Sequence, residues 1–245
     1  MANAECKVAL VTGANKGIGL AIVSQLADLG YVVLLGARDA SRGAEAVASI
    51  SRQGRDVRFQ LIDITDADSV ARAAADIERE FGRLDALVNN AGLKLEWHPS
   101  PPSQCTMDLV RQTYETNVFG TMSIILAMLP LVRRSGAGRI VNVSSGLGSI
   151  GLAKTPNTPY NLKPMLSYST SKTAVNALTV QFANELRDTP IKVNAADPGY
   201  TATDMTFHDG ARTPDMAARP IVRLATLPAD GPSGGFFDES GVVPW

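Results

Sequence analysis

The sequence predicts an α/β protein, with a doubly wound parallel sheet and helices on both faces, formed by one domain over residues 1–245. Short apolar runs alternate with helical patterns along the whole chain, and no break in composition suggests a domain boundary. The apolar runs also lack polar alternation, which is typical of strands that are buried on both faces of a parallel sheet. Alternating strands and helices of this kind are joined by right-handed crossovers.

Six apolar runs are expected to form strands, and a short segment near the carboxyl terminus is a candidate for a seventh. They are Val8–Val11, Tyr31–Leu35, Val57–Ile62, Leu84–Val88, Ile140–Val143, Ile191–Ala196 and, as the candidate, Gly234–Phe237. Each of the first six is four to six residues long, bounded by helical patterns or loops, and rich in aliphatic side chains. This length and composition favour buried strands over short helices.

Helical patterns fill the intervals between these runs. The first has an apolar face from Ile18 to Leu29, and the third follows an expected cap at Thr65–Asp68 and buries Val70, Ala74, Ile77 and Phe81. The others are Ala40–Ser51, about Met107–Arg134, about Leu166–Arg187 and Pro214–Leu227. Pro220 is expected to interrupt the last of them, because proline cannot donate the helical hydrogen bond, and the start of that helix stays open.

Composition argues against several classes of function. The net charge of −1 gives no electrostatic reason to expect nucleic acid or an anionic membrane as a partner. Cys6 and Cys105 have no metal-ligand spacing, so no metal site is expected. Met1–Lys7 has no signal-peptide pattern, and the longest apolar stretch, Val118–Val132, is short for a bilayer span and contains Pro130. We therefore expect a cytoplasmic protein, with homo-oligomer formation left open.

A glycine-rich segment, Thr12–Gly19, lies between the first strand and the first helix. Gly13, Gly17 and Gly19 let the chain turn sharply and let a phosphate approach the backbone, which any Cβ would obstruct. The helix start adds unpaired N–H groups and a positive dipole end. The spacing G-x-x-x-G-x-G predicts a nucleotide-phosphate site, and the alternative is a glycine-rich turn that binds nothing.

Polar or glycine-containing segments follow each of the six strands, which favours the nucleotide site. In a parallel sheet the carboxyl ends of the strands meet at one edge, and ligands bind outside that edge. The residues expected there are Gly13, Arg38, Asp63, Asn89–Gly92, Ser145 and Pro198–Gly199.

Over nearly its whole length the chain resembles the short-chain dehydrogenase/reductase family, of core Rossmann-fold type. Thr12–Gly19 matches the family's cofactor loop, Asn89–Gly92 its motif after the fourth strand, and Pro198–Gly199 with Thr203 its segment against the nicotinamide carboxamide. The resemblance implies an NADP cofactor bound by Gly13, Asn15, Lys16, Gly17, Ile18, Gly19, Arg38, Asp63, Ile64, Asn90, Ala91, Gly92, Tyr168, Lys172, Pro198, Gly199, Thr201 and Thr203.

The same resemblance implies four catalytic residues: Asn117, Ser145, Tyr168 and Lys172. Tyr168 and Lys172 are four residues apart and share a helix face. An adjacent ammonium, together with the positive nicotinamide of an oxidised cofactor, is expected to lower the pKa of the Tyr168 phenol, which would give its proton to a carbonyl oxygen. The alternative is a surface tyrosine–lysine pair.

Two of the catalytic assignments have rivals in the sequence. Ser145 would hydrogen-bond the substrate oxygen, and Ser144 beside it is the alternative. By resemblance Asn117 would hold a water that connects Lys172 to solvent, but its amide could equally brace a bend in the helix.

Cofactor choice rests on the segment after the second strand. Ala37 stands where the family carries an acid for the ribose 2′-hydroxyl, and Arg38 follows it. A guanidinium suits a phosphate, and Lys16 adds a second cation, so NADPH is expected. Asp39 is interpreted as the cap of the next helix. By resemblance Asp63 would accept from the adenine amino group, and capping through the following turn is its alternative.

We therefore expect an NADP(H)-dependent carbonyl reductase or alcohol dehydrogenase acting on a small-molecule carbonyl or alcohol substrate. The rivals are an NAD-linked alcohol dehydrogenase and a catalytically silent nucleotide-binding sensor. The interval from Ser145 to Tyr168 is longer than usual in the family, and the segment from Tyr200 to Arg212 is short for a lid. Trp97, Met205 and Phe207 are candidates for an apolar substrate pocket, and the alternative is that the loop aromatics simply pack on the surface.

Overall fold

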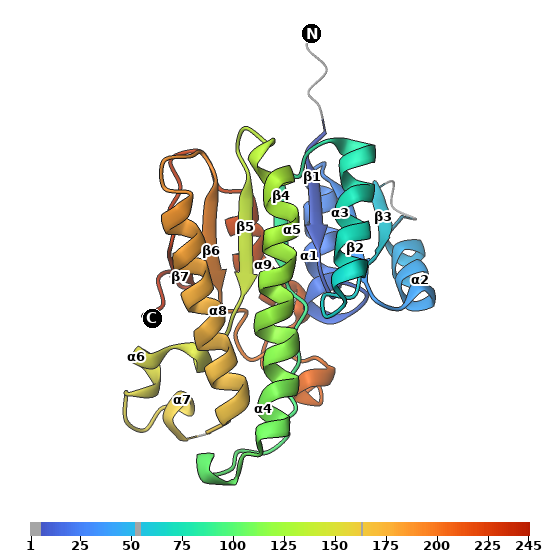
Figure 1. Cartoon of the computed structure of the whole chain (residues 1–245). Helices are drawn as coiled ribbons and strands as arrows, with labels where there is room; N and C mark the ends of the chain where they lie inside the picture. Colours follow the sequence, from blue (N-terminus) through green and yellow to red (C-terminus); the bar gives the residue numbers. More distant parts are fainter. Residues whose placement is uncertain (1–5, 52–54, 163) are drawn as a thin grey trace.

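The six predicted strands and the seventh candidate form one parallel sheet in the computed structural model, which describes residues 6–51, 55–162 and 164–245 (Figure 1). The spatial order is β3-β2-β1-β4-β5-β6-β7. The first three strands are added toward one side of the sheet and the later strands toward the other, so the strand order reverses between β1 and β4. Such folds bind ligands at this switch point. The strands are β1 Val8–Val11, β2 Val32–Ala37, β3 Val57–Leu61, β4 Ala86–Asn89, β5 Arg139–Val143, β6 Lys192–Ala196 and β7 Phe236–Phe237.

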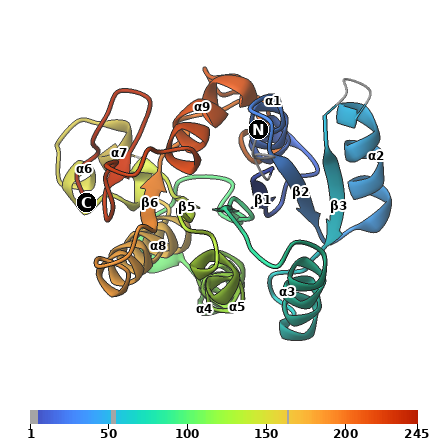
Figure 2. The same cartoon turned by 90° about the horizontal axis from the view of Figure 1, so that it is seen from above.

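Helices cover both faces of this sheet, as Figure 2 shows from above. One face carries α1 (Gly17–Asp28), α2 (Ala40–Ser51) and α9 (Pro214–Ala225), and the other carries α3 (Ala67–Phe81), α5 (Thr121–Arg133) and α8 (Leu166–Glu185). Alternate strand residues supply the two cores: in β1, Ala9 and Val11 face the first layer, while Val8 and Leu10 face the second. The predicted doubly wound fold is confirmed.

The predicted long helix from Met107 consists of three parts. Helix α4 (Met107–Tyr114) runs through a π-helical segment, η2 (Glu115–Gly120), into α5. By length and composition Met107–Arg133 is the one helix in the described part of the chain that could cross a bilayer, because α4 and the start of η2 extend the shorter apolar stretch Val118–Val132. However, 56% of its most apolar window is buried inside the molecule, as in the core helix of a globular protein.

The expected interruption at Pro220 is wrong, because α9 is continuous from Pro214 to Ala225. Thr213 caps its amino end by accepting from the Met216 N–H at 3.2 Å. Proline at position 220 deprives the Met216 carbonyl of its helical donor. The Arg212 guanidinium donates to that carbonyl at 2.9 Å, so a tertiary contact replaces the lost helical bond.

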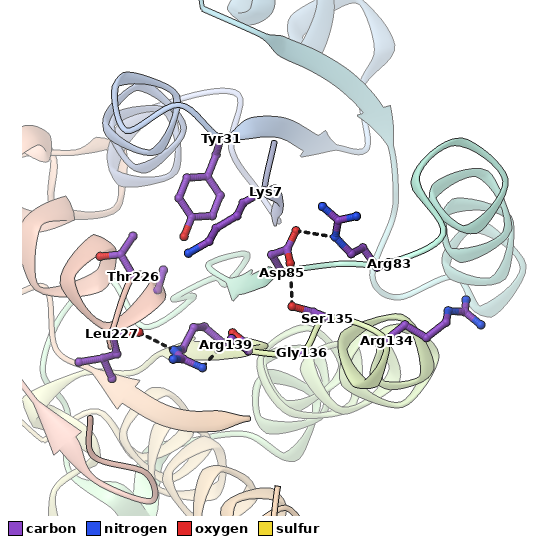
Figure 3. A pocket seen from close by; sticks show the side chains of 12 residues that line it. Lys7, Tyr31, Arg83, Asp85, Arg134, Ser135, Gly136, Arg139, Thr226 and Leu227 are labelled. Carbon is purple, nitrogen blue, oxygen red and sulfur yellow. Dashed lines mark hydrogen bonds and ion pairs between the residues drawn. The ribbon is translucent and has the colours of Figure 1, made fainter. Parts of the chain in front are cut away.

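The amino edge of the sheet is held by a network around Arg139 and Asp85 (Figure 3). The buried Arg139 guanidinium donates five hydrogen bonds of 2.9–3.1 Å to backbone carbonyls of residues 137, 138, 190, 227 and 228. Asp85 accepts from the Val8 N–H at 2.8 Å and from the Ser135 hydroxyl at 2.7 Å. Asp85, Ser135 and Arg139 line a pocket of about 460 Å³ at the edge opposite the predicted site, and their polar groups serve the fold.

We expect Arg139→Leu to lower the free energy of unfolding by about 2–4 kcal/mol, because it leaves buried carbonyls without their donor. Urea unfolding followed by circular dichroism measures the change. Arg133→Leu is the matched control: its guanidinium makes a half-exposed pair with Glu185, which is worth no more than about 1 kcal/mol. Equal losses in the two variants would contradict a structural role of the Arg139 network.

Candidate active site

The predicted site residues lie at the carboxyl ends of β1 to β6, along one edge of the sheet. This edge is the lower one in Figure 1, where α4 and the two short helices α6 (Ile150–Ala153) and α7 (Pro159–Leu162) also lie. The parallel pairing of all neighbouring strands brings these ends together, although the segments are spread over almost two hundred residues of the chain. The predicted convergence on one edge is therefore present.

The segment after β4 holds the glycine loop in shape. The Asn90 side-chain amide donates to the carbonyls of Thr12 and Gly13 at 2.9 and 3.1 Å, and the Thr12 hydroxyl accepts from the backbone N–H groups of Asn90 and Ala91. Gly13 has φ +62°, and a Cβ there would lie 2.8 Å from the Ala91 Cα. No larger residue fits this position, so the loop and the β4 end form one preformed cradle.

Helix α1 presents its amino end to this cradle. Among the described residues no side chain caps the helix, and its first turn contains no acidic residue. A Cβ on Gly19 would lie 2.7 Å from the Gly13 carbonyl oxygen, so the turn is as tight here as at Gly13. Asn15, Lys16, Gly17 and Ile18 belong to the same turn. An uncapped helix end beside a glycine cradle fits the phosphates of a dinucleotide.

The two expected 2′-phosphate cations have different surroundings. Lys16 forms an exposed ion pair with Asp204, which comes from the segment after β6. Arg38 is exposed after β2 and makes no hydrogen bond or ion pair with any residue the structure describes. Asp39 accepts from the Arg42 N–H at 3.0 Å at the start of α2, so its interpretation as a helix cap is confirmed. Lys16 is thus ion-paired with a carboxylate, whereas Arg38 interacts with the Asp63 carboxylate only through its charge.

Asp63 and Ile64 follow β3 as predicted. One Asp63 carboxylate oxygen accepts from the N–H and the hydroxyl of Thr65, at 3.0 and 2.7 Å, so the alternative of a local turn is present. Burial raises the pKa of Asp63, but the Thr65 hydrogen bonds and the Arg38 charge outweigh it and hold the pKa below its ordinary value. Ile64 packs against Gly120 of the π-helical segment. A role of either residue toward adenine stays a prediction.

Tyr168 and Lys172 lie on the first turns of α8 and are 8% and 5% exposed, so the surface-pair alternative is wrong. The Lys172 ammonium donates to the Val143 carbonyl at the end of β5, at 2.8 Å, and lies 5.8 Å from the centre of the Tyr168 ring. A Cβ on Gly92, in the segment after β4, would be 3.4 Å from the Lys172 Nζ. The Tyr168–Lys172 pair therefore lies next to the segment that forms the glycine cradle.

The expected lowering of the Tyr168 pKa is wrong for the protein without cofactor. Burial raises the pKa of Tyr168 to about 12, and the charge of Asp197 acts in the same direction, while a hydrogen bond with Ser145 opposes them. Burial lowers the pKa of Lys172 to about 8, against the effect of Asp197. Desolvation disfavours the charged form of both groups, so at neutral pH the phenol keeps its proton.

The structure favours Ser145 over Ser144 as the substrate-facing hydroxyl. Ser144 is 2% exposed, and its hydroxyl donates to the Asn176 side-chain oxygen at 2.6 Å in the core. Ser145 is partly exposed, caps the short helical turn η3 (Gly146–Gly148) and contacts Tyr168. Only Ser145 is therefore able to meet a ligand beside the phenol.

Asn117 lies in the π-helical segment η2, where its amide braces the helix. The side-chain oxygen accepts from the Leu93 N–H at 2.8 Å, and the side-chain nitrogen donates to the Leu93 carbonyl and the Ser171 hydroxyl at 2.9 and 3.0 Å. The bracing alternative is thus confirmed. A Cβ on Gly92 would lie 3.3 Å from the Asn117 side-chain oxygen and 3.4 Å from the Lys172 Nζ, so both side chains approach Gly92. A water relay between the two stays a prediction.

Pro198, Gly199, Thr201 and Thr203 follow β6 and reach back to the glycine loop. The Thr203 methyl would lie 3.5 Å from a Cβ on Gly17, and the segment continues into the turn η4 (Asp204–Thr206). Its last aromatic residue, Phe207, contacts Trp97 with ring centres 5.3 Å apart. The two candidate pocket aromatics are therefore neighbours, contributed by the segments after β4 and β6.

Sequence reasoning missed two residues beside the catalytic pair. Asp197 is buried at the end of β6 and accepts from the Gly199 N–H at 2.9 Å. Tyr160 belongs to α7, in the long interval before Tyr168, and its ring packs closely on Gly146. A Cβ on Gly146 would lie 2.5 Å from the Tyr160 ring and 2.9 Å from the Asp197 carboxylate. Asp197 stands in a strand-end motif that could have signalled it, whereas nothing in the sequence relates Tyr160 to Gly146.

The carboxyl terminus packs against the long interval. The Gly151 N–H donates to the Trp245 carbonyl at 2.7 Å, and the Ser149 hydroxyl donates to the Pro244 carbonyl at 2.5 Å. The Trp245 ring stacks on Phe236 of β7. The extra residues between Ser145 and Tyr168 are thus tied to the last strand and the chain end.

A sequence model described as short chain dehydrogenase matches residues 7–212. The chain belongs to this family. The short-chain dehydrogenase anuI of Penicillium roqueforti is 38% identical over 223 residues, covering 89% of this chain and 87% of that protein. Carbonyl reductase 1 of Rattus norvegicus, whose name specifies NADPH, is 34% identical over 277 residues, covering 97% of this chain and 98% of the relative.

A solved structure supports the same family membership. The NADPH-bound carbonyl reductase from chicken fatty liver has a TM-score of 0.84 at 29% identity, and the alignment covers 98% of this chain and 99% of that one. The family resemblance and the Rossmann-type fold expected from the sequence are confirmed, and the chain is an oxidoreductase of the short-chain dehydrogenase type.

The buried lysine makes this family member's stability depend on pH. Lys172 titrates at about 8 when folded and at its ordinary 10.5 when unfolded, so below pH 8 the full cost of burying the ammonium is present. Between pH 8 and 10 the unfolded chain holds a proton that the folded protein has released, so stability rises with pH. Stability falls again only above pH 10, where the Tyr168 phenol loses its proton in the unfolded chain but keeps it in the folded protein.

We therefore expect Lys172→Met to be more stable than the natural protein at pH 7, by on the order of 2–3 kcal/mol, and this advantage to shrink toward pH 10. Urea unfolding at several pH values measures it, with Lys154→Met, at the exposed residue that follows α6, as control. An advantage that stays constant with pH would show that the ammonium is not buried as described.

Proposed function

We propose that the protein is an NADPH-dependent reductase of small ketones or aldehydes, or the corresponding alcohol dehydrogenase, with Tyr168 as proton donor. The observation that carries this proposal is the buried Tyr168–Lys172 pair, with Ser145 against the phenol, beside an uncapped helix end and a glycine cradle. Relatives named NADPH carbonyl reductases support the cofactor and the reaction. A purely nucleotide-binding sensor has no use for a desolvated phenol and ammonium.

The site fits a nicotinamide dinucleotide by its own chemistry. A Cβ at Gly13 or Gly19 would fill the cradle, and the first turn of α1 offers N–H groups to phosphate oxygens. When bound, this cofactor supplies or accepts the hydride. The residues of the chain bind it, orient the carbonyl and exclude water, and the Lys172 ammonium is available to the ribose hydroxyls.

Proton transfer is the part of the reaction that the chain itself performs. In the reducing direction the Ser145 hydroxyl holds the substrate oxygen near the Tyr168 hydroxyl, and that oxygen takes the phenolic proton as its carbon is reduced. The pKa of about 12 keeps the phenol protonated before reaction. The phenolate that results is stabilised by the Lys172 ammonium and by Ser145, and it regains a proton from solvent.

The substrate proposed for this site is apolar around its carbonyl. Trp97 and Phe207 stand together over the segments after β4 and β6, and the Tyr160 ring lies against Gly146 beside Ser145. Aromatic or medium-chain ketones suit such walls, because their apolar groups pack against aromatic rings.

Replacing Tyr168 by phenylalanine tests the proposed function directly. We expect turnover of an aromatic ketone with NADPH to fall about 10²–10⁴-fold, the usual contribution of a positioned acid, while the dissociation constant of NADPH stays within about twofold. NADPH absorbance and a fluorescence titration measure the two quantities. Tyr31→Phe, an equally buried tyrosine at the opposite sheet edge, is the control and keeps full activity. Normal turnover in Tyr168→Phe would reject the proposed function.

The choice of NADPH over NADH depends on Arg38 in this proposal. Charge-assisted hydrogen bonds to a 2′-phosphate contribute roughly 1.5–3 kcal/mol each, so Arg38→Ala should weaken NADPH binding by about 10–10²-fold and leave NADH binding unchanged. Asp204→Asn should tighten NADPH binding, because it frees Lys16 from its ion pair.

Calorimetric titration of both cofactors decides the matter, with the exposed Arg79→Ala on α3 as control. Equal affinities for NADPH and NADH in the natural protein would show that neither cation meets a 2′-phosphate.

A further inference from the structure

The catalytic helix α8 begins without a capping side chain of its own. Its first residue is Leu166, and the residue at the N-cap position, Met165, makes no capping hydrogen bond. The first turn of a helix leaves N–H groups without helical partners, and such a turn frays unless an acceptor is supplied. Tyr168 lies in this first turn, so the backbone that carries the phenol is the part of α8 that most needs an external acceptor.

The acceptor is Glu96, which comes from the segment after β4, more than seventy residues earlier in the chain. Its Oε2 accepts from the Tyr168 N–H at 2.9 Å and from the Ser167 hydroxyl at 2.7 Å. Glu96 is only 6% exposed, and Ser167 is fully buried. The contact has the geometry of a normal helix cap, but its carboxylate belongs to a distant segment.

A third element supports this cap from the other side. The Thr113 hydroxyl of α4 donates to the Leu109 carbonyl at 2.8 Å, and its oxygen lies 3.3 Å from the Ser167 hydroxyl oxygen. A buried series of polar contacts therefore connects α4 with Ser167 and Glu96. A carboxylate is rarely buried without such partners, since the desolvation cost is several kcal/mol.

From this geometry we infer that Glu96 is a positioning residue for catalysis, which holds the backbone of Tyr168 in register with Ser145 and the substrate oxygen. The inference rests on the proposed function of Tyr168 as proton donor. Lys172, one turn further along α8, has its own anchor on the Val143 carbonyl. Loss of the cap should therefore displace the phenol more than the ammonium, and proton transfer should suffer while cofactor binding does not.

This positioning role requires the length of the Glu96 side chain rather than its charge. Glu96→Gln keeps the chain length and one oxygen that can accept both donors. Glu96→Asp keeps the charge but is one methylene shorter, so its oxygen falls short of the Tyr168 N–H. Because a displacement of about 1 Å can cost 10²-fold in rate, we expect kcat to fall about 10–10²-fold in Glu96→Asp and Glu96→Ala, and less than about threefold in Glu96→Gln.

The experiment measures kcat and KM for an aromatic ketone, and the dissociation constant and stoichiometry of NADPH, for all three variants. NADPH stoichiometry counts the folded sites, so a variant that merely unfolds loses binding capacity in proportion to rate. We expect the NADPH dissociation constant to stay within about twofold in every variant. Glu185→Ala, at the exposed far end of the same helix, is the matched control and keeps the natural kcat.

The outcomes separate this inference from the proposed function. If Tyr168→Phe is inactive but Glu96→Ala and Glu96→Asp keep the natural kcat per bound NADPH, the positioning role of Glu96 is overturned and the proton donor stands. If Glu96→Asp matches the natural protein while Glu96→Gln does not, charge rather than reach is what matters, and the inference is likewise overturned. Normal activity of Tyr168→Phe rejects the proposed function itself.

Discussion

Burial of the Lys172 ammonium is the constraint on which the arrangement of the carboxyl edge depends. The group is desolvated and has one hydrogen bond from the described residues, to the Val143 carbonyl, so its position is set by how firmly α8 lies against the sheet. Side chains along the helix supply that firmness. Ser144 donates to Asn176, and the Thr173 hydroxyl donates to the Gly148 carbonyl at 2.9 Å. The cost of one buried charge is thus offset by a helix fixed along its length.

The two edges of the sheet show opposite uses of polar groups. At the amino edge the Arg139 guanidinium donates to five carbonyls, and the Asp85 carboxylate is occupied by backbone and hydroxyl donors. At the carboxyl edge the amino end of α1 has no side-chain cap, and Arg38 makes no hydrogen bond or ion pair with the described residues. Polar groups left available on a rigid frame are what a binding site needs, at a cost in stability.

The sequence predicted the features that depend on local periodicity and on strand order. The bounds of α2 are those expected, and the polar segments meet at one edge because parallel strands leave no other arrangement. The wrong predictions depend on distant partners. Pro220 is accommodated because Arg212 reaches the carbonyl that it leaves free, and the Tyr168 pKa rises because burial and the Asp197 charge outweigh the Ser145 hydrogen bond. Neither effect has a trace in the residues around the position concerned.

Glu96 belongs to the same class of features and shows why site residues of this kind escape sequence reasoning. A glutamate in a loop is most simply a solvated side chain, and only the fold brings it to the amino end of α8. Its neighbour Trp97 contacts Phe207 from the segment after β6. Two adjacent residues of one loop thus contact two elements that are far apart in the sequence, the amino end of α8 and the segment after β6. Such contacts follow from the packing of the whole fold, so the residues around Glu96 do not predict them.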